Sequence, residues 1–169
     1  MKIPVFVSCP TDLNPDQEAT RQLVLGMIDR YGLEPRALGR SDYPVNLPLG
    51  EVLILAKHCS GGVILGFEQF QAVTGIEKRG TPKEKHVGSP TSFPTPWNQL
   101  EGGILCALQR PLLVFKEASV SGGVFGTGTL DVFVHRMPRP PLAVTEEAAL
   151  NSVFLKWQAN VREIYYRYP

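Results

Sequence analysis

Trp97 and Glu101 are the residues whose types and spacing best suit chemistry on a small ligand. They lie four residues apart, which puts an indole and a carboxylate on one face of a helix. A carboxylate beneath a sugar ring can stabilise the positive charge that develops when a glycosidic bond breaks, or can capture the sugar carbon covalently. An indole can stack on a base or a pyridinium ring. Glu101 is therefore the candidate catalytic residue and Trp97 a candidate substrate-binding residue. The alternatives are a carboxylate placed only for the helix dipole and an aromatic that packs against a loop.

The elements that must position this pair follow from the hydrophobic pattern of the chain. Apolar or β-branched runs predict strands at residues 3–9, 34–39, 62–66, 112–116 and 132–135, and apolar spacing and capping predict helices at residues 15–31, 49–58, 96–109 and about 145–167. Strands that alternate with helices form open, mostly parallel sheets. We therefore predict an α/β fold: a flavodoxin-like three-layer sandwich with a mostly parallel five-stranded sheet, plus a C-terminal helix.

Ligands bind such sheets at the carboxyl ends of the strands, which selects further candidates from position alone. Substrate-binding candidates are Ser8, Pro10, Arg40, Asp42, Phe67, Glu68, Trp97 and Asn98. Glu68 is a second carboxylate candidate at the end of the central strand, or a surface loop residue. Arg40 and Asp42 suit a phosphate and ribose hydroxyls, or form a solvated turn.

The segment at residues 67–95 is rich in Gly, Pro, Ser, Thr and Lys, and no period persists in it. We expect a long structureless loop, which in a compact domain is typical of a functional loop or lid. Its basic residues, Lys78, Arg79, Lys83 and Lys85, either close over a pyrophosphate or keep the loop solvated.

Composition limits the class of protein. The 169 residues suit one domain over residues 1–169, and a formal net charge of +1 gives no broad attraction to nucleic acid or anionic lipid. Apolar runs are too short for a membrane span, and no secretory leader is expected at the N-terminus, so we expect a cytoplasmic location. Three cysteines, Cys9, Cys59 and Cys106, are expected to be buried packing residues. No spacing indicates a metal site or a bound cofactor.

Three stretches together resemble a known family. They are Val5-Phe6-Val7-Ser8, the Gly-Gly-Val-Ile-Leu run at residues 61–65, and Trp97-x-x-x-Glu101 followed by the hydrophobic run at residues 110–115. Over residues 3–116 the chain resembles a Toll/interleukin-1 receptor (TIR) domain and its structural relatives, the nucleoside 2-deoxyribosyltransferases. The long insert at residues 67–95 and the extra C-terminal helix resemble a bacterial stand-alone member.

The resemblance implies that Glu101 either cleaves the nicotinamide–ribose bond of NAD, which would be substrate rather than cofactor, or attacks C1′ of a deoxynucleoside. It also implies a homo-oligomer and a role in defence signalling. Three hypotheses follow: an NAD glycohydrolase or cyclase; a nucleoside 2-deoxyribosyltransferase or nucleoside hydrolase; and a non-catalytic nucleotide-sensing or TIR-type interaction module. The expected partner is a nucleotide or nucleoside as small molecule, or another protein chain in the case of an interaction module. We expect no nucleic-acid partner and no membrane partner.

Overall fold

A parallel five-stranded sheet forms the centre of the protein. The computed structural model describes residues 2–39 and 47–167. The strands are β1 (Ile3–Ser8), β2 (Leu33–Arg36), β3 (Gly62–Gly66), β8 (Leu112–Lys116) and β9 (Val134–Arg136). They lie in the order β2-β1-β3-β8-β9, and every neighbouring pair is parallel. The chain therefore has the α/β flavodoxin-like fold that the sequence predicts, with the strand order reversing between β1 and β3.

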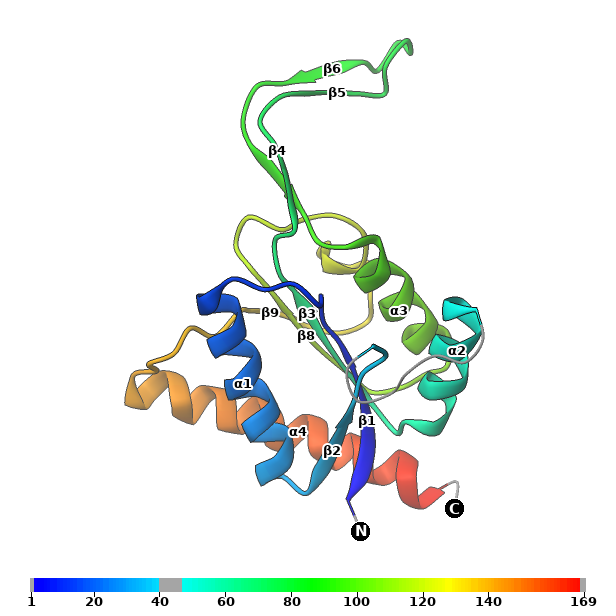
Figure 1. Ribbon diagram of the computed structural model, residues 1–169, viewed down its shortest axis with the longest axis vertical. Helices are drawn as coiled ribbons and strands as arrows, with labels where there is room; N and C mark the ends of the chain where they lie inside the picture. Colours follow the sequence, from blue (N-terminus) through cyan, green and yellow to red (C-terminus); the bar gives the residue numbers. More distant parts are fainter. Residues whose placement is uncertain (1, 40–46, 168–169) are drawn as a thin grey trace.

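Helices cover both faces of the sheet and complete the three layers (Figure 1). Helices α1 (Pro15–Arg30) and α4 (Val144–Arg167) pack on one face, and α2 (Pro48–His58) and α3 (Pro96–Ala107) on the other. Alternate side chains of each strand enter opposite cores: Val5 and Val7 face α1 and α4, whereas Phe6 faces α2 and α3. A third cluster joins β3 and β8 to the loop with the short helix η1 (Gly123–Phe125). This two-sided burial explains the unbroken apolar runs of the central strands.

Local sequence determines where the first helix begins and ends. The Asn14 side chain accepts a hydrogen bond from the Gln17 backbone N–H at 2.9 Å, and the Gln17 side chain accepts one from the Asn14 backbone N–H at 3.2 Å. This capping box satisfies two N–H groups that the helix cannot pair itself. At the other end Gly32 has φ +71°, a conformation that favours glycine. The predicted helix is confirmed with nearly its expected bounds.

Residues 69–93, which we call the arm, differ from the predicted structureless loop. The chain rises from the end of β3, turns, and returns to α3 as a long two-stranded ribbon (Figure 1). β4 (Phe70–Ala72) pairs antiparallel with β7 (Thr91–Phe93), and β5 (Gly75–Glu77) with β6 (Lys85–Val87). Strands of three residues are too short to show a hydrophobic period, so the sequence pattern did not reveal them.

The cysteine prediction is wrong in part. Cys59 is buried, but Cys9 is only half-buried and Cys106 is exposed. Cys106 follows Leu105 on α3, and only Leu105 of the two turns toward the sheet, because consecutive helical residues point about 100° apart. Over the described ranges, no helix is both long and apolar enough to cross a membrane.

Candidate active site

A cavity of about 310 Å³ lies at the carboxyl edge of the sheet, beside the point where strand order reverses. It is built from the segments after β1 and β2 and from the first turns of α2 and α3. Its lining residues are Cys9, Pro10, Thr11, Leu38, Gly39, Pro48, Thr95, Trp97, Asn98 and Glu101. The helix α3 therefore brings its indole and its carboxylate to one cavity, as their spacing predicts.

Asn98 fixes the start of α3 to the sheet. Its side chain is 1% exposed and donates a hydrogen bond to Ser8 Oγ at 2.8 Å and a longer one to the Leu65 carbonyl at 3.4 Å. Thr95 caps the helix, because its Oγ1 accepts from the Asn98 backbone N–H at 3.2 Å and donates to Asn98 Oδ1 at 3.0 Å. A buried and fully paired polar network of this kind restricts the position of the helix end.

The Glu101 carboxylate occupies a partly desolvated position next to that network. Burial raises its pKa to about 7, and a hydrogen bond with Ser8 opposes the rise because it favours the ionised form. The next residue, Gly102, lets α3 approach β3 closely: a Cβ there would lie 2.9 Å from Ile64 Cδ1. Close packing thus holds the helix turn that carries Glu101 against the sheet. Trp97, one turn earlier, is 45% exposed at the rim.

The sequence-predicted candidates do not all meet at the cavity. Pro10, Trp97, Asn98 and Glu101 line it, and Ser8 lies behind it, hydrogen-bonded to Asn98. Phe67 is fully buried in the core between the sheet, α1 and α4 and is not part of the lining. Arg40 and Asp42 lie outside the described residues.

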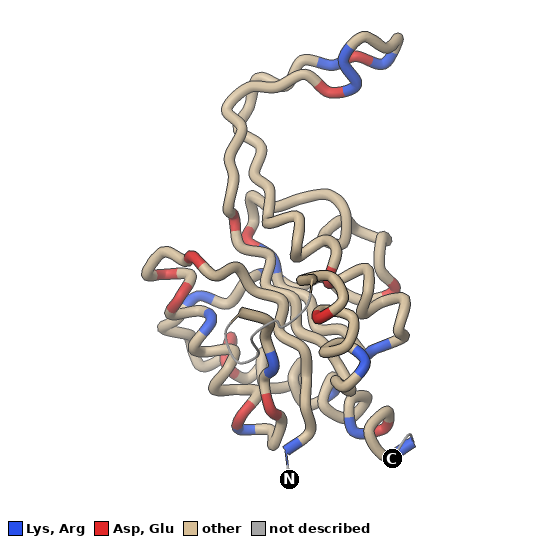
Figure 2. The backbone as a smooth tube through the Cα atoms, turned by 45° about the vertical axis from the view of Figure 1, so that its right-hand side comes forward, with Lys and Arg blue, Asp and Glu red and all other residues tan. Residues whose placement is uncertain are grey.

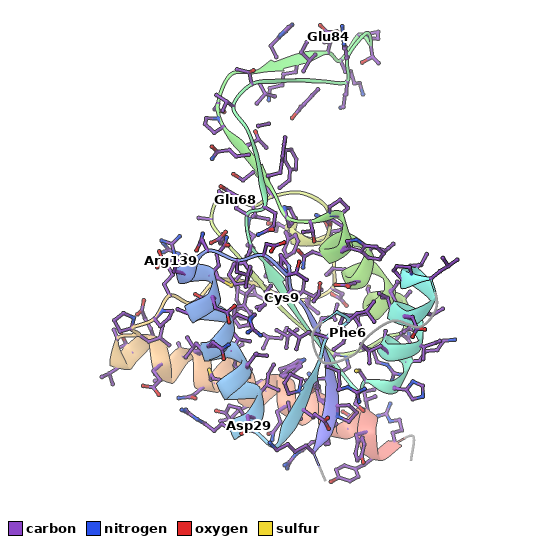
Figure 3. All side chains as sticks on the ribbon, in the orientation of Figure 1. Phe6, Cys9, Asp29, Glu68, Glu84 and Arg139 are labelled. Carbon is purple, nitrogen blue, oxygen red and sulfur yellow. The ribbon has the colours of Figure 1, made fainter. Side chains whose placement is uncertain are left out.

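Glu68 belongs to a different group of side chains at the base of the arm (Figure 3). Its carboxylate accepts a short hydrogen bond from Ser92 Oγ in β7, and its backbone N–H donates to Glu117 Oε2 at 2.6 Å. Gln17 Nε2 donates to the same Glu117 oxygen and to the Glu68 carbonyl, each at 3.2 Å. Glu68 therefore ties α1, β8 and the arm together, away from the cavity lining.

Sequence reasoning missed several lining residues: Cys9, Thr11, Leu38, Gly39, Pro48 and Thr95. Cys9 and Thr11 lie in the segment after the first strand, where the sequence already predicts a ligand site because ligands bind at the carboxyl ends of parallel strands. Thr95 has a usable signal, because Thr before Pro is a frequent helix start. Leu38 and Pro48 carry no chemical signal and join the cavity only through packing.

A second cavity, of about 380 Å³, lies between β9 and α4 and has different chemistry. Arg136, Arg139 and His135 line it, and burial lowers the pKa of His135. Its one carboxylate, Glu146, accepts a hydrogen bond from the Ala143 backbone N–H at 2.9 Å, at the start of α4. The cavity of about 310 Å³ differs, because its lining combines a carboxylate, Glu101, with an exposed indole, Trp97. Within the described part of the chain no group of three or more His, Cys, Asp or Glu residues could hold a metal ion.

Comparison with models of known protein families gives no match, and comparison with curated proteins finds no significant relative.

Proposed function

We propose that the protein cleaves the N-glycosidic bond of a nucleotide, with NAD as substrate, as a glycohydrolase or cyclase, and that Glu101 is the catalytic residue. One observation carries the proposal: a carboxylate and an indole, one helical turn apart, line a single cavity at the carboxyl edge of the sheet. The likeness of this arrangement to the TIR domain and deoxyribosyltransferase pattern supports the choice of bond. NAD is the substrate in this scheme, and no separate cofactor takes part.

The reaction needs one ionised carboxylate. When the C1′–N bond breaks, its electron pair goes to the nicotinamide nitrogen, so the cationic ring leaves as neutral nicotinamide and needs no general acid. Positive charge develops on the ribose, and the Glu101 carboxylate stabilises that charge or forms a bond to C1′. Water then attacks C1′, any bond between C1′ and Glu101 breaks with its electron pair returning to the carboxylate, and the proton of the attacking water passes to solvent to give ADP-ribose. Attack by a nucleophile within the same molecule instead gives a cyclic product.

The residues around Glu101 suit this role. With a pKa of about 7, Glu101 is about half ionised at neutral pH, and the bond with Ser8 favours the ionised form. Asn98 orients Ser8 by donating to its Oγ. Trp97 offers an aromatic face at the rim for the nicotinamide or adenine ring. Pro10 adds an apolar wall.

Purified protein incubated with NAD, with products separated by chromatography and identified by mass, tests the proposal. We expect release of nicotinamide that Glu101→Gln abolishes. The second product distinguishes hydrolysis from cyclisation, and parallel incubations with deoxynucleosides test the same carboxylate chemistry on another sugar. Tight nucleotide binding without turnover would overturn the catalytic assignment and leave the non-catalytic sensing module as the better description.

A further inference from the structure

The cavity of about 380 Å³ between β9 and α4 takes no part in the proposed function and shares no lining residue with the candidate active site. It lies on the face of the sheet that α1 and α4 cover, because Phe115, Met137 and Leu150 belong both to its lining and to the core on that face. These three side chains are no more than 8% exposed and form its floor. The half-buried Leu142 and Val153 add apolar walls. The inner part of the cavity is therefore apolar.

Contacts between rings hold the floor of this cavity in place. The centroid of the Phe115 ring lies 6.2 Å from that of Phe154, which stacks on it, and 5.7 Å from that of His135, which also lines the cavity. The imidazole is uncharged at neutral pH, because burial lowers the pKa of His135 from its ordinary value. A preformed cavity that is mostly apolar, with a few polar groups at set places, is typical of a site for a small ligand.

Positive charge lies at the mouth of the cavity. Charged residues lie mainly on the helices, the connecting segments and the outer end of the arm, and few lie in the central strands (Figure 2). Arg136 ends β9, Arg139 follows it, and both line the cavity with exposed side chains. The one carboxylate of the lining, Glu146, accepts a backbone hydrogen bond at the start of α4. Arg139 also borders a neighbouring cavity with Asp16 and Glu117, but no carboxylate of the described residues forms an ion pair with it.

We propose that the cavity between β9 and α4 binds a small monocarboxylate with an apolar body. Arg139 binds the carboxylate at the mouth, and the body lies against Phe115 and Leu150. A guanidinium and a carboxylate can pair through two parallel hydrogen bonds, which fixes the head of the ligand. Burial of the body adds affinity in proportion to the apolar area that leaves water. Because both parts contribute, a bare anion and an uncharged apolar molecule should each bind weakly.

Isothermal titration calorimetry of the full chain with octanoate tests the site. Acetate keeps the carboxylate without the body, octanol keeps the body without the charge, and octylamine reverses the charge. We expect saturable binding of octanoate, and binding at least about tenfold weaker for each of the other three, because the charged hydrogen bonds and the buried body each contribute that much. Octylamine or octanol that binds as tightly as octanoate would overturn the choice of an anionic ligand, and acetate that does so would overturn the role of the apolar floor.

Two variants locate the site. Arg139→Gln removes a charge at the mouth and should weaken octanoate binding about tenfold. Ala149→Trp places a large side chain at an exposed position of α4 that lines the cavity, and it should abolish binding by filling the space. The matched controls, Arg162→Gln and Ala159→Trp, change exposed positions of α4 outside the lining and should bind octanoate like the parent. Circular dichroism checks that each protein is folded.

The same titrations can contradict the proposal. A folded parent that does not bind octanoate would overturn it, as would an Arg139→Gln or Ala149→Trp protein that binds octanoate like the parent. Trp97→Ala should keep the parent's affinity for octanoate, because Trp97 lines the other cavity. Loss of binding in that variant would place the carboxylate in the candidate active site and overturn the second site. None of these results depends on cleavage of NAD, so failure of this site and failure of the proposed function are distinguishable.

Discussion

Glu101 and Glu68 lie at the same edge of one sheet, where ligands bind in this fold. Glu68 follows β3, and Glu101 lies in the second turn of α3. Their surroundings differ. Glu101 faces a cavity beside an exposed indole, and burial raises its pKa to about 7. Glu68 accepts a hydrogen bond from the buried Ser92 and lies at a junction of α1, β8 and the arm. The comparison shows that position along the sheet edge is not sufficient: the cavity that Glu101 lines, and that Glu68 does not, distinguishes a candidate catalytic group from a structural one.

The largest expected effect is on the reaction itself. Glu101→Gln keeps the shape of the side chain and removes its charge, so the charge that develops on the ribose loses its stabilising partner. We expect nicotinamide release to fall by about 100-fold or more, as happens when one electrostatic stabiliser is removed from an active site. Initial rates from timed chromatography measure this, and a loss of less than about tenfold would contradict the assignment of Glu101.

The pH dependence of the reaction rate is the next test of the difference between Glu101 and Glu68. In the proposed reaction the ionised form of Glu101 is the active one, and the pKa of Glu101 is about 7. The rate at low substrate should therefore rise about tenfold from pH 6 to pH 8, in proportion to the ionised fraction. Glu68→Gln should show the same profile, because Glu68 does not line the cavity and takes no part in the proposed reaction. A profile that is flat across this range, or one that falls, would show that the ionised carboxylate is not limiting.

Trp97→Ala tests the aromatic half of the cavity. Stacking of a base on an aromatic side chain contributes about 1–3 kcal/mol, so we expect KM for NAD to rise about tenfold. Because Trp97 binds the ring and does not react in the proposed mechanism, kcat should change by less than about threefold. Steady-state kinetics separate the two constants. Trp97→Phe, which keeps an aromatic face, is the control and should restore most of the affinity.

Thermal unfolding against pH distinguishes the two carboxylates without any substrate. A carboxyl whose pKa is raised on folding binds more protons in the folded state, so its contribution to stability falls as pH rises from about 4.5 to about 7. Glu101→Gln removes this pH-dependent contribution to the free energy of unfolding, because glutamine does not ionise. Its melting temperature should exceed that of the parent by a few degrees at pH 8, with the gap closing toward pH 4.5, since about 1 kcal/mol moves Tm by about 2–4 °C. A gap that is constant with pH would contradict a desolvated Glu101.

The smallest effect is expected at the other carboxylate. Glu68→Gln leaves a side chain that can still accept a hydrogen bond from Ser92. We expect nicotinamide release to change by less than about twofold, measured at the same pH as for Glu101→Gln. A loss comparable to that of Glu101→Gln would mean that the junction below the arm takes part in the reaction.

Much of the fold is predictable because its elements have strong local causes. Asn14 and Pro15 begin a helix through capping, and the apolar run at residues 62–66 lacks polar alternation, as expected for a strand that is covered on both faces. The run at residues 112–116 matches β8 residue for residue. The arm could not be predicted, because its strands have three residues each and nearly all of those residues are exposed or half-exposed.

The site is predictable only where helical spacing decides it. Trp97, Asn98 and Glu101 come together because one helix carries them, and Pro10 because it follows the first strand. Phe67 and Glu68 also follow a strand, yet Phe67 turns into the core and the Glu68 carboxylate turns to Ser92. Which way a side chain turns at a strand end depends on partners far away in the sequence. Leu38 and Pro48 reach the cavity through packing of this kind.

The most direct measurement is nicotinamide release from NAD by three proteins at equal concentration: the parent, Glu101→Gln and Glu68→Gln. We expect release by the parent and by Glu68→Gln at rates within about twofold of each other, and none above background by Glu101→Gln. Equal release by all three folded proteins would contradict the central role of Glu101 in this cavity.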